Sequence, residues 1–273
     1  MAKKQHQSDH LRCRMHVYVI NLARRPDRRA FMQQQADRLG LQFDYIDAVD
    51  ARTDASEFAE IEVRAGLHGR ISRGDLACTL SHRKFWRLFL ETGAPYAVVL
   101  EDDAVLAEDC ARFFTDSDWI PPGADVVKLE RHGKAKPIFM DRLMRPAHGR
   151  QVGRLYSKCA GTAGYVVSAA GARRLLAATT RVDDPIDQMM FNPGRSPLFD
   201  RLAPYVLEPS ICEQEQVAVV TDIQRTRTTT RTHQLQAALD ELRAVPRQLL
   251  LYAKLLALLL AGRVEGRVLT FRR

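Results

Sequence analysis

The first part of the chain alternates short apolar runs with a segment that has helix start and stop signals. Val17–Ile20 is rich in β-branched and aromatic residues and predicts a buried strand. Pro26 and Gly40 mark the beginning and the end of a helix expected over 26–39. Leu41–Ile46 predicts a second strand. A strand, a helix and a strand within roughly thirty residues form a βαβ unit, which implies parallel pairing.

A longer helix and a fully apolar strand come next. Apolar residues between Leu76 and Phe89 lie on one broad helical face, and Gly93 with Pro95 ends this helix. The run Tyr96–Leu100 predicts a buried strand that leads directly into three acidic residues. Further elements are expected as strands at 125–129 and 165–167 and as a helix from Ser168 to Ala178.

Two charged stretches carry weaker signals. Residues 51–72 predict a loop with a short helix, and residues 131–158, which are rich in Arg, Lys, Gly and Pro, predict a long mobile loop. Strands that alternate with helices predict an α/β domain with a mixed, mainly parallel sheet flanked by helices. We therefore divide the chain into a basic tail (1–15), this domain (16–224) and a basic, amphipathic helical arm (225–273).

Composition and charge narrow the class of protein. Of the 273 residues, 46% are apolar and 27% are charged, a globular balance that excludes disordered and fibrous chains. The net charge of +8 lies at the ends, with +5 in residues 1–28 and +7 in residues 225–273, which leaves −4 for residues 29–224. A mildly acidic body argues against a nucleic-acid-binding domain, although binding of nucleic acid through the basic ends stays a competing hypothesis.

No segment predicts a secretory signal or a membrane-spanning helix. The first residues are polar and basic, and the apolar run Leu249–Leu260 is shorter than the ~20 residues that a spanning helix needs. We therefore expect a cytoplasmic protein. Two interpretations of the basic arm stay open. It either makes a peripheral contact with the anionic inner face of the cell membrane, or it packs on the body or on a second subunit of a homo-oligomer.

The acidic triplet after the apolar strand is the first candidate for chemistry. Open α/β sheets bind ligands at the carboxyl ends of their strands, where Glu101, Asp102 and Asp103 are expected. Adjacent carboxylates repel one another and favour a bound cation, and an all-oxygen ligand set suits Mg²⁺ or Mn²⁺. A solvated turn with Asp103 capping the next helix explains the same residues without a metal. A metal-dependent phosphoester hydrolase and a transferase that uses a nucleotide sugar are both compatible with the triplet.

Five short motifs follow one another in order along residues 16–224. They are Val19–Leu22 followed by Arg25, Gly74–His82, Val98–Asp103, Gly161–Ser168 and Pro185–Gln188. Together they resemble glycosyltransferase family 25, the group of lipooligosaccharide and collagen galactosyltransferases. Two positions depart from the family pattern: Ala77 stands where a glycine is common, and Lys128-Leu-Glu130 is more charged than the usual strand end.

The resemblance implies a GT-A-like fold and an inverting hexosyltransferase. The implied donor is a UDP-sugar, with UDP-galactose preferred, and the implied acceptor is a lipopolysaccharide, a lipooligosaccharide or a related glycan or glycolipid. Inversion needs a base for the acceptor hydroxyl; Asp187 is the candidate, with Asp184 and Glu130 as alternatives. The resemblance implies a Mn²⁺ or Mg²⁺ ion held by Glu101 and Asp103. It implies donor contacts at Asn21, Leu22, Arg25, Ser81, His82, Glu101, Asp102, Gly161 and Thr162.

Overall fold

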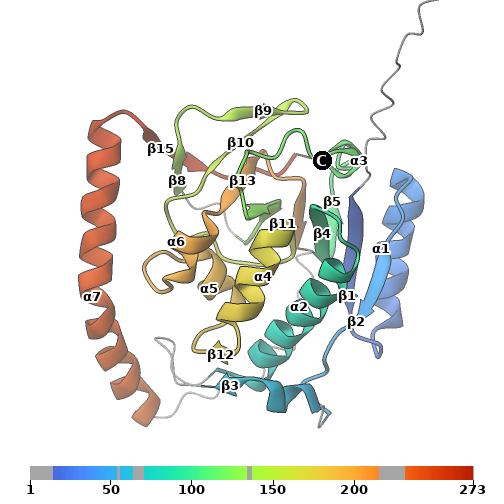
Figure 1. The fold of residues 1–273 in the computed structure, drawn as a ribbon, viewed down its shortest axis with the longest axis horizontal. Coiled ribbons are helices and arrows are strands. Elements are labelled where there is room, and N and C mark those ends of the chain that lie inside the picture. The colour runs from blue at the N-terminus through green and yellow to red at the C-terminus, as the bar shows by residue number, and fades with distance from the viewer. Residues whose placement is uncertain (1–14, 54–55, 64–70, 134–136, 215–230, 273) are drawn as a thin grey trace, which may run out of the picture.

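The computed structural model describes residues 15–53, 56–63, 71–133, 137–214 and 231–272, and of 231–244 it describes the backbone only. A central sheet runs in the order β2-β1-β4-β11-β6-β13-β10-β9 (Figure 1). Parallel pairing joins β1 to β2 and to β4 and joins β6 to β13, whereas β10 and β11 run antiparallel to their neighbours. Six of the eight strands therefore point the same way, which confirms the mixed, mainly parallel sheet. These strands are β1 (His16–Asn21), β2 (Asp44–Asp47), β4 (Tyr96–Glu101), β6 (Val126–Lys128), β9 (Arg145–Ala147), β10 (Arg150–Arg154), β11 (Gly164–Ser168) and β13 (Tyr205–Glu208).

The first βαβ unit forms as predicted. Helix α1 (Pro26–Leu39) begins at Pro26 and ends at Gly40, whose left-handed backbone (φ 63°) suits glycine best. Strands β1 and β2 pair in parallel, so the crossover expected from the sequence is confirmed. Strand β2 covers the second half of the predicted segment, because residues 41–43 connect Gly40 to the strand without regular secondary structure.

Helix α2 (Arg73–Glu91) begins with a reciprocal pair of hydrogen bonds. The Ser72 hydroxyl accepts the N–H of Asp75 (3.1 Å), and the Asp75 carboxylate accepts the N–H of Ser72 (3.3 Å). This capping box satisfies two donors that the helix start otherwise leaves open. The other helices are η1 (Ser56–Glu60), α3 (Ala111–Thr115), α4 (Ala169–Ala178), α5 (Ile186–Phe191), α6 (Leu198–Leu202) and α7 (Arg231–Leu260).

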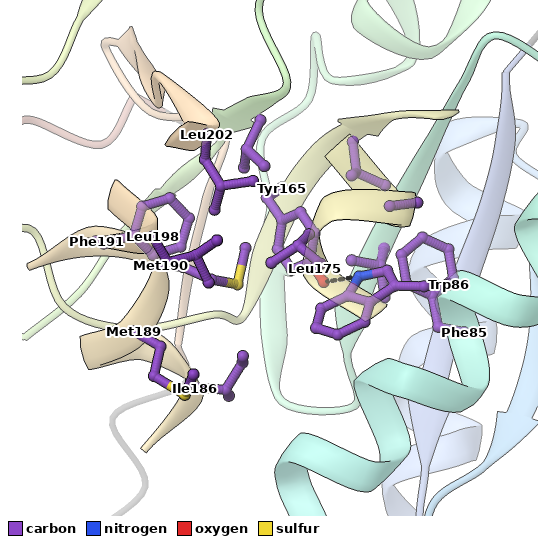
Figure 2. Packing of buried hydrophobic residues seen from close by; sticks show 14 of the residues in the cluster. Phe85, Trp86, Tyr165, Leu175, Ile186, Met189, Met190, Phe191, Leu198 and Leu202 are labelled. Carbon is purple, nitrogen blue, oxygen red and sulfur yellow. Dashed lines mark hydrogen bonds between the residues drawn. The ribbon is translucent and has the colours of Figure 1, made fainter. Parts of the chain in front are cut away.

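The central sheet carries a hydrophobic core on each face, which explains why its inner strands are apolar throughout. In β4, Ala97 and Val99 belong to one core, and Val98 and Leu100 belong to the other. Helices α2, α4, α5 and α6 cover the first face, and α1 and α3 cover the second. Figure 2 shows the first core, where side chains of α2 and α5 pack around Tyr165 of β11.

The loop predicted for residues 131–158 is wrong over half of its length. The described part of this stretch contains β8 (Pro137–Asp141), β9 and β10, together with the end of β7 (Glu130–Arg131). Each of β8 and β10 pairs with a strand far along the chain, β8 with β15 (Val264–Val268) and β10 with β13. Such partners leave no signal in the local pattern, so the charged and glycine-containing sequence alone suggests a loop.

The arm predicted for residues 225–273 is helical only in part. Helix α7 stands at the edge of the molecule, and the chain then turns back as β15 beside β8 (Figure 1). The N–H of Ser210 donates to the carbonyl of Thr270 (2.7 Å), which fastens the segment after β15 to the domain. Among the described residues, no helix combines the length and the apolar character needed to cross a bilayer. The remaining short strands are β3 (Glu62–Val63), β5 (Ala104–Leu106), β12 (Arg181–Val182) and β14 (Cys212–Gln214).

A buried arginine also joins the C-terminal segment to the domain. The Arg150 side chain is fully buried and donates to the carbonyls of Pro209 (3.0 Å), Ser210 (2.8 Å) and Arg272 (3.0 Å). Its charge is paired with Asp109. One guanidinium therefore satisfies three carbonyls and one carboxylate from segments that are distant in sequence.

Replacing Arg150→Met should lower the free energy of unfolding by about 3 kcal/mol, because it removes one partner of a buried ion pair. Urea unfolding followed by circular dichroism measures this change. The matched control is Arg112→Met, an exposed arginine on α3 that forms no ion pair within the described residues, and its change should stay within about 0.5 kcal/mol. Equal losses in the two variants would contradict the role given to Arg150.

Candidate active site

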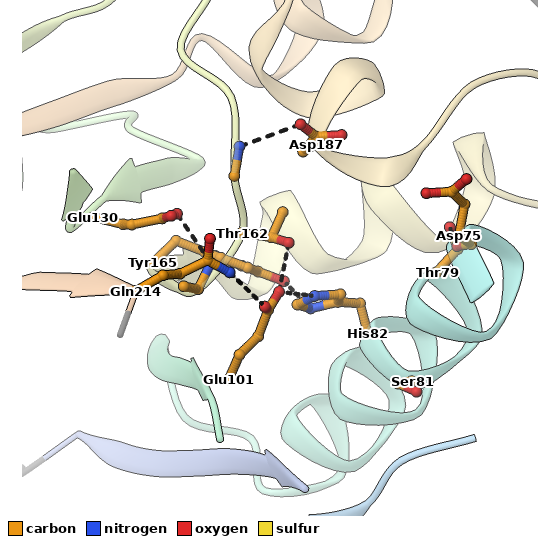
Figure 3. A network of polar contacts seen from close by, with 12 residues as sticks. Asp75, Thr79, Ser81, His82, Glu101, Glu130, Thr162, Tyr165, Asp187 and Gln214 are labelled. Carbon is orange, nitrogen blue, oxygen red and sulfur yellow. Dashed lines mark hydrogen bonds and ion pairs between the residues drawn. The ribbon is translucent and has the colours of Figure 1, made fainter. Parts of the chain in front are cut away.

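Three carboxylates meet at one short loop, residues 161–163. The hydroxyl of Thr162 donates to Glu101 Oε1 (2.6 Å). The backbone N–H of Ala163 donates to Glu130 Oε2 (3.0 Å), and the backbone N–H of Gly161 donates to Asp187 Oδ2 (3.2 Å) (Figure 3). The loop thus fixes the relative positions of three acidic side chains that come from distant parts of the sequence.

The strand topology brings these residues together. Strand β11 starts at Gly164 and runs antiparallel to β4 and β6, so the residues just before it lie at the carboxyl ends of those two strands. Glu101 is the last residue of β4, and Glu130 follows β6 after one residue. This edge is where open α/β sheets bind their ligands. Helix α5 adds Asp187 to the same edge.

Lys128 and Glu130 are the most deeply buried charges of the site. Lys128 Nζ donates to Glu130 Oε2 (2.7 Å) and to the carbonyl of Gly161 (2.6 Å), and neither charged side chain is exposed. Burial by itself lowers the pKa of Lys128 and raises that of Glu130. The attraction between the two charges outweighs burial, so the pKa of the lysine is raised and that of the carboxyl is lowered.

Glu130 has no free oxygen with which to act as the general base. Its Oε2 is occupied by Lys128 and by a backbone N–H, and the ring of His132 lies 3.2 Å from Oε1. The hydrogen bond to Glu130 raises the pKa of His132, although burial opposes the shift. These contacts and its burial favour a positioning role for Glu130, and the base role considered for it stays an untested prediction.

Gly161 permits the close approach between the loop and Glu130. Its φ of +92° is a backbone conformation that other residues rarely adopt. A Cβ at this position would lie 2.5 Å from Glu130 Oε1 and 2.8 Å from His132 Nδ1. The glycine is thus required both by the backbone and by the space that the Glu130 carboxylate occupies.

Asp187, the predicted base, has one oxygen held and one open. It lies in the first turn of α5, where Oδ2 accepts from the Gly161 N–H and from Gln188 Nε2 (2.8 Å). No described residue donates a hydrogen bond to Oδ1. A carboxylate oriented through one oxygen and free at the other has the geometry that a general base needs. The alternative, Asp184, is buried.

A chain of buried hydrogen bonds orients His82 toward Glu101. Trp86 Nε1 donates to the Tyr165 hydroxyl (2.9 Å), which lies 3.0 Å from His82 Nδ1 (Figure 3 shows the histidine, the tyrosine and Glu101). Because the tyrosine accepts from the indole, its own proton is directed to Nδ1. We therefore assign the imidazole proton to Nε2, which lies 3.4 Å from Glu101 Oε1.

Ser81, the neighbour of His82, points away from this cluster (Figure 3). Its hydroxyl donates to the carbonyl of Ala77 (2.7 Å) and accepts the N–H of Val49 (2.9 Å), and the residue is buried. The donor contact expected of Ser81 is corrected, because both hydrogen-bonding directions of its hydroxyl are used to hold the 48–49 segment against α2.

Cys78, His82 and Glu101 offer three ligand atoms within 4.8 Å of one another. Burial, together with the charge of Glu101, raises the pKa of the Cys78 thiol well above its ordinary value. The hydrogen bonds of His82 and Glu101 already account for the arrangement of this trio, so we do not assign it to a metal.

Asp102 holds the turn between β1 and α1. Its Oδ2 accepts from Asn21 Nδ2 (2.8 Å) and from the N–H of Leu22 (3.4 Å), and its Oδ1 accepts from Arg28 (2.7 Å). Asn21 is buried, and its amide Nδ2 donates both to Asp102 and to the carbonyl of Arg25 (3.3 Å). Asn21 and Asp102, both expected at the donor, are thus used by the fold to set the shape of this turn.

Arg25 and Leu22 stay at the carboxyl end of β1 as predicted. The Arg25 side chain donates to both oxygens of Asp27 (2.9 and 3.2 Å from Nε). This hydrogen bonding lowers the pKa of Asp27 to about 2. Asp27 is exposed and Arg25 is half-buried, so a diphosphate can compete with Asp27 for the guanidinium, and a donor contact at Arg25 stays a prediction.

Asp103 has the features of a cation ligand. Its Oδ1 is buried and has no hydrogen-bond partner within the described chain. Burial, followed by the charge of Glu101, raises the pKa of Asp103 to about 7, against the opposing effect of Arg28. A buried, unpartnered carboxylate oxygen next to a second carboxylate fits Mn²⁺ or Mg²⁺. The pair Glu101 and Asp103 therefore satisfies the chemistry expected of the metal site, while the ion itself stays a prediction.

The sequence missed four side chains that this geometry depends on. Arg28 is the cation beside the acidic triplet, Lys128 supports the loop, Tyr165 orients His82, and Gln214 Nε2 lies 3.5 Å from Glu101 Oε2. Three of them left a signal in the sequence: Lys128 is a charge at the end of an apolar strand, Arg28 follows the first family motif, and Tyr165 lies within the motif Gly161–Ser168.

Comparison with known proteins finds a family model, glycosyltransferase family 25 (LPS biosynthesis protein), that matches residues 15–190. The chain is 34% identical over 219 residues to the lacto-N-neotetraose biosynthesis glycosyltransferase LgtB of Neisseria meningitidis serogroup B, covering 74% of this chain and 76% of that protein. It is 27% identical over 214 residues to the lipooligosaccharide biosynthesis protein lic2B of Haemophilus influenzae, covering 74% and 77%. A solved glycosyltransferase involved in the glycosylation of the major capsid of PBCV-1 aligns with a TM-score of 0.43 and 8% identity, covering 77% of this chain and 97% of that one. The family match spans β1 to α5, the elements that carry the site.

Gly161→Ala tests the approach of the loop to Glu130. Gly149→Ala is the matched control, because Gly149 also has a positive φ (+81°), but a methyl group at that position would meet no other atom within 4 Å. Backbone strain alone should cost Gly149→Ala about 1 kcal/mol of unfolding free energy. The added collision with a buried carboxylate should cost Gly161→Ala about 2 kcal/mol more. Equal values from urea unfolding would show that the loop and Glu130 are not in close contact.

Proposed function

The chain belongs to glycosyltransferase family 25 and is a glycosyltransferase, and we propose that it transfers a hexose from a nucleotide sugar to a lipopolysaccharide or lipooligosaccharide glycan with inversion at the anomeric carbon. The proposed donor is UDP-galactose, and the proposed acceptor is a hydroxyl of a glycan or glycolipid. The relatives named for lacto-N-neotetraose and for lipooligosaccharide biosynthesis support this acceptor class. Family membership favours transfer over phosphoester hydrolysis and over nucleic-acid binding, the alternatives that the sequence left open.

One observation carries this proposal: loop 161–163 holds Glu101, the proposed metal ligand, and Asp187, the proposed general base, at one edge of the sheet. Glu101 is held by Thr162, and Asp187 is held by the N–H of Gly161. Metal-assisted inverting transfer places these two groups on either side of the reacting carbon, one toward the departing diphosphate and the other toward the acceptor. Because a single loop is bonded to both, it restricts the separation of the two carboxylates.

Asp187 is the proposed general base. The acceptor oxygen forms its bond to the anomeric carbon as the bond from that carbon to the diphosphate breaks, and Oδ1 of Asp187 takes the acceptor proton. The contacts of Oδ2 with Gly161 and Gln188 keep the carboxylate oriented during the transfer. The freed diphosphate leaves as the nucleoside diphosphate.

Glu101 and Asp103 are the proposed ligands of a Mn²⁺ or Mg²⁺ ion. When bound, such an ion neutralises the diphosphate charge that develops as the sugar leaves. Hydrogen bonds from Thr162 and His82 engage Glu101 Oε1, and among the described residues its Oε2 has only the long contact with Gln214. The second oxygen of Glu101 and the unpartnered Oδ1 of Asp103 are therefore the atoms that we assign to the ion.

Asp187→Asn should lower the rate of transfer by about 10²–10⁴-fold, because the amide cannot accept the acceptor proton. Purified protein is given radiolabelled UDP-galactose and truncated lipooligosaccharide, and labelled glycan is counted; other UDP-sugars are run in parallel. Asp183→Asn is the matched control, an acid in the segment just before α5 that pairs with Arg181 (3.8 Å), and it should keep nearly full activity. Unchanged transfer by Asp187→Asn would exclude this residue as the base, and no transfer from any UDP-sugar would overturn the proposed donor class.

Chelation with EDTA should abolish transfer, and Mn²⁺ should restore it. Asp103→Asn should raise the Mn²⁺ concentration for half-maximal activity by about tenfold or more, because it removes a ligand oxygen. Asp118→Asn, an exposed acid outside the site, is the control and should leave the Mn²⁺ titration unchanged. Full activity in EDTA would contradict metal assistance while leaving the family assignment intact.

A further inference from the structure

The outward half of α7 is apolar wherever its side chains are described. Between residues 245 and 260, every exposed side chain is Val, Pro, Leu, Ala or Tyr, apart from Lys254. The large exposed ones reach from 38% to 81% exposure, and they are Val245, Leu249, Leu250, Tyr252, Leu256, Leu259 and Leu260. A continuous apolar face of this kind on an ordered helix marks an interaction surface.

The opposite side of α7 is anchored to the domain. Arg247 donates to the carbonyls of Pro193 (2.6 Å) and Ser196 (2.8 Å) and pairs with Asp200 (2.7 Å). Leu255 is buried on the same side. The direction of the apolar face is therefore set by packing and hydrogen bonds, and the face is held outward by the domain itself.

A cavity of about 290 Å³ lies where α7 meets the domain, and its uncompensated charge is positive. Arg154 and Lys254 line it, and in the described part of the chain neither side chain forms an ion pair. Asp200 also lines the cavity, but its charge is paired with Arg247. Residues 242–264 contain four Arg or Lys and no acid. The cavity and the helix beside it thus favour an anionic group next to an apolar phase.

We propose that α7 docks this enzyme onto an anionic lipid bilayer, with the apolar face in the membrane interface and a lipid phosphate in the cationic cavity. Amphipathic helices bind bilayers through buried apolar area and through attraction to anionic headgroups, and α7 offers both. A second copy of the chain is a poorer partner for this face, because it would bring the same unpaired cations together without an anion between them.

The position of the cavity links docking to the site. Its wall includes Leu155 and Tyr156, which lead into loop 161–163, and Pro193 and Phe199, which follow α5 and its Asp187. The same two segments therefore line the cavity and carry the site. Docking deepens the proposed function, since a glycolipid acceptor in the same bilayer would be presented near this edge, but membrane binding does not itself depend on which sugar is transferred.

Vesicle sedimentation tests the proposal with the full-length protein. Wild type should bind vesicles of phosphatidylglycerol mixed with phosphatidylcholine and should bind pure phosphatidylcholine much more weakly. The triple variant Leu249→Gln, Leu256→Gln and Leu260→Gln should bind anionic vesicles about tenfold or more weakly, because it removes exposed apolar area. Lys254→Gln and Arg154→Gln should each weaken binding about fivefold. These positions lie outside the proposed machinery, so release of galactose from UDP-galactose in vesicle-free buffer should be unchanged in all variants.

The control is Leu88→Gln, an exposed leucine on α2 that should bind vesicles like wild type. The proposal is overturned if wild type does not bind anionic vesicles, or if the triple variant binds them as well as wild type does. Analytical ultracentrifugation provides a further decision: a dimer that the triple variant dissociates, without vesicle binding, would assign the face to a second copy instead. If wild type does not turn over UDP-galactose, the proposed donor is wrong. The vesicle-binding result is then interpreted independently of the donor.

Discussion

The buried ion pair between Lys128 and Glu130 is the constraint on which the site depends. Two charges removed from water cost several kcal/mol each unless their partners satisfy them. Here the loop supplies those partners: the carbonyl of Gly161 accepts from Lys128, and the backbone N–H of Ala163 donates to Glu130. Neither the pair nor the loop can move without leaving a buried polar group unsatisfied. The positions of Glu101 and Asp187 follow from this, since both are bonded to the same loop.

Elements whose signals lie within one segment of the chain could be predicted from the sequence. Helix α1 has its own start and stop residues, and β4 is apolar because both faces of the sheet are covered. Strands β8 and β10 could not be predicted in the same way. Their polar residues face solvent or distant partners, and β8 exists through its pairing with β15, whose sequence lies beyond α7. Local pattern carries no information about such a partner.

The candidate site, like the fold, could be predicted from the sequence only where the signal is local. Residue types at the carboxyl ends of strands could be named, and Glu101, Thr162 and Asp187 do meet there. What the sequence could not supply is the partner of each polar group. Ser81 and Asp102 look like ligand-binding residues in one dimension, but backbone and arginine donors from other segments already occupy them. Their hydrogen bonds hold segments around the site in place, and only the tertiary contacts reveal this role.

The pairing of β8 with β15 has a consequence for the order in which the chain acquires its structure. During synthesis β8 leaves the ribosome before residues 142–263 have emerged, and its partner strand follows only after α7. Until then β8 lacks this partner, and the buried Arg150 lacks the carbonyl of Arg272. An unpaired strand edge beside an incompletely satisfied charge is a point at which nascent chains associate with one another or with chaperones. The last strand of the fold thus also covers the edge that β8 would otherwise leave unpaired.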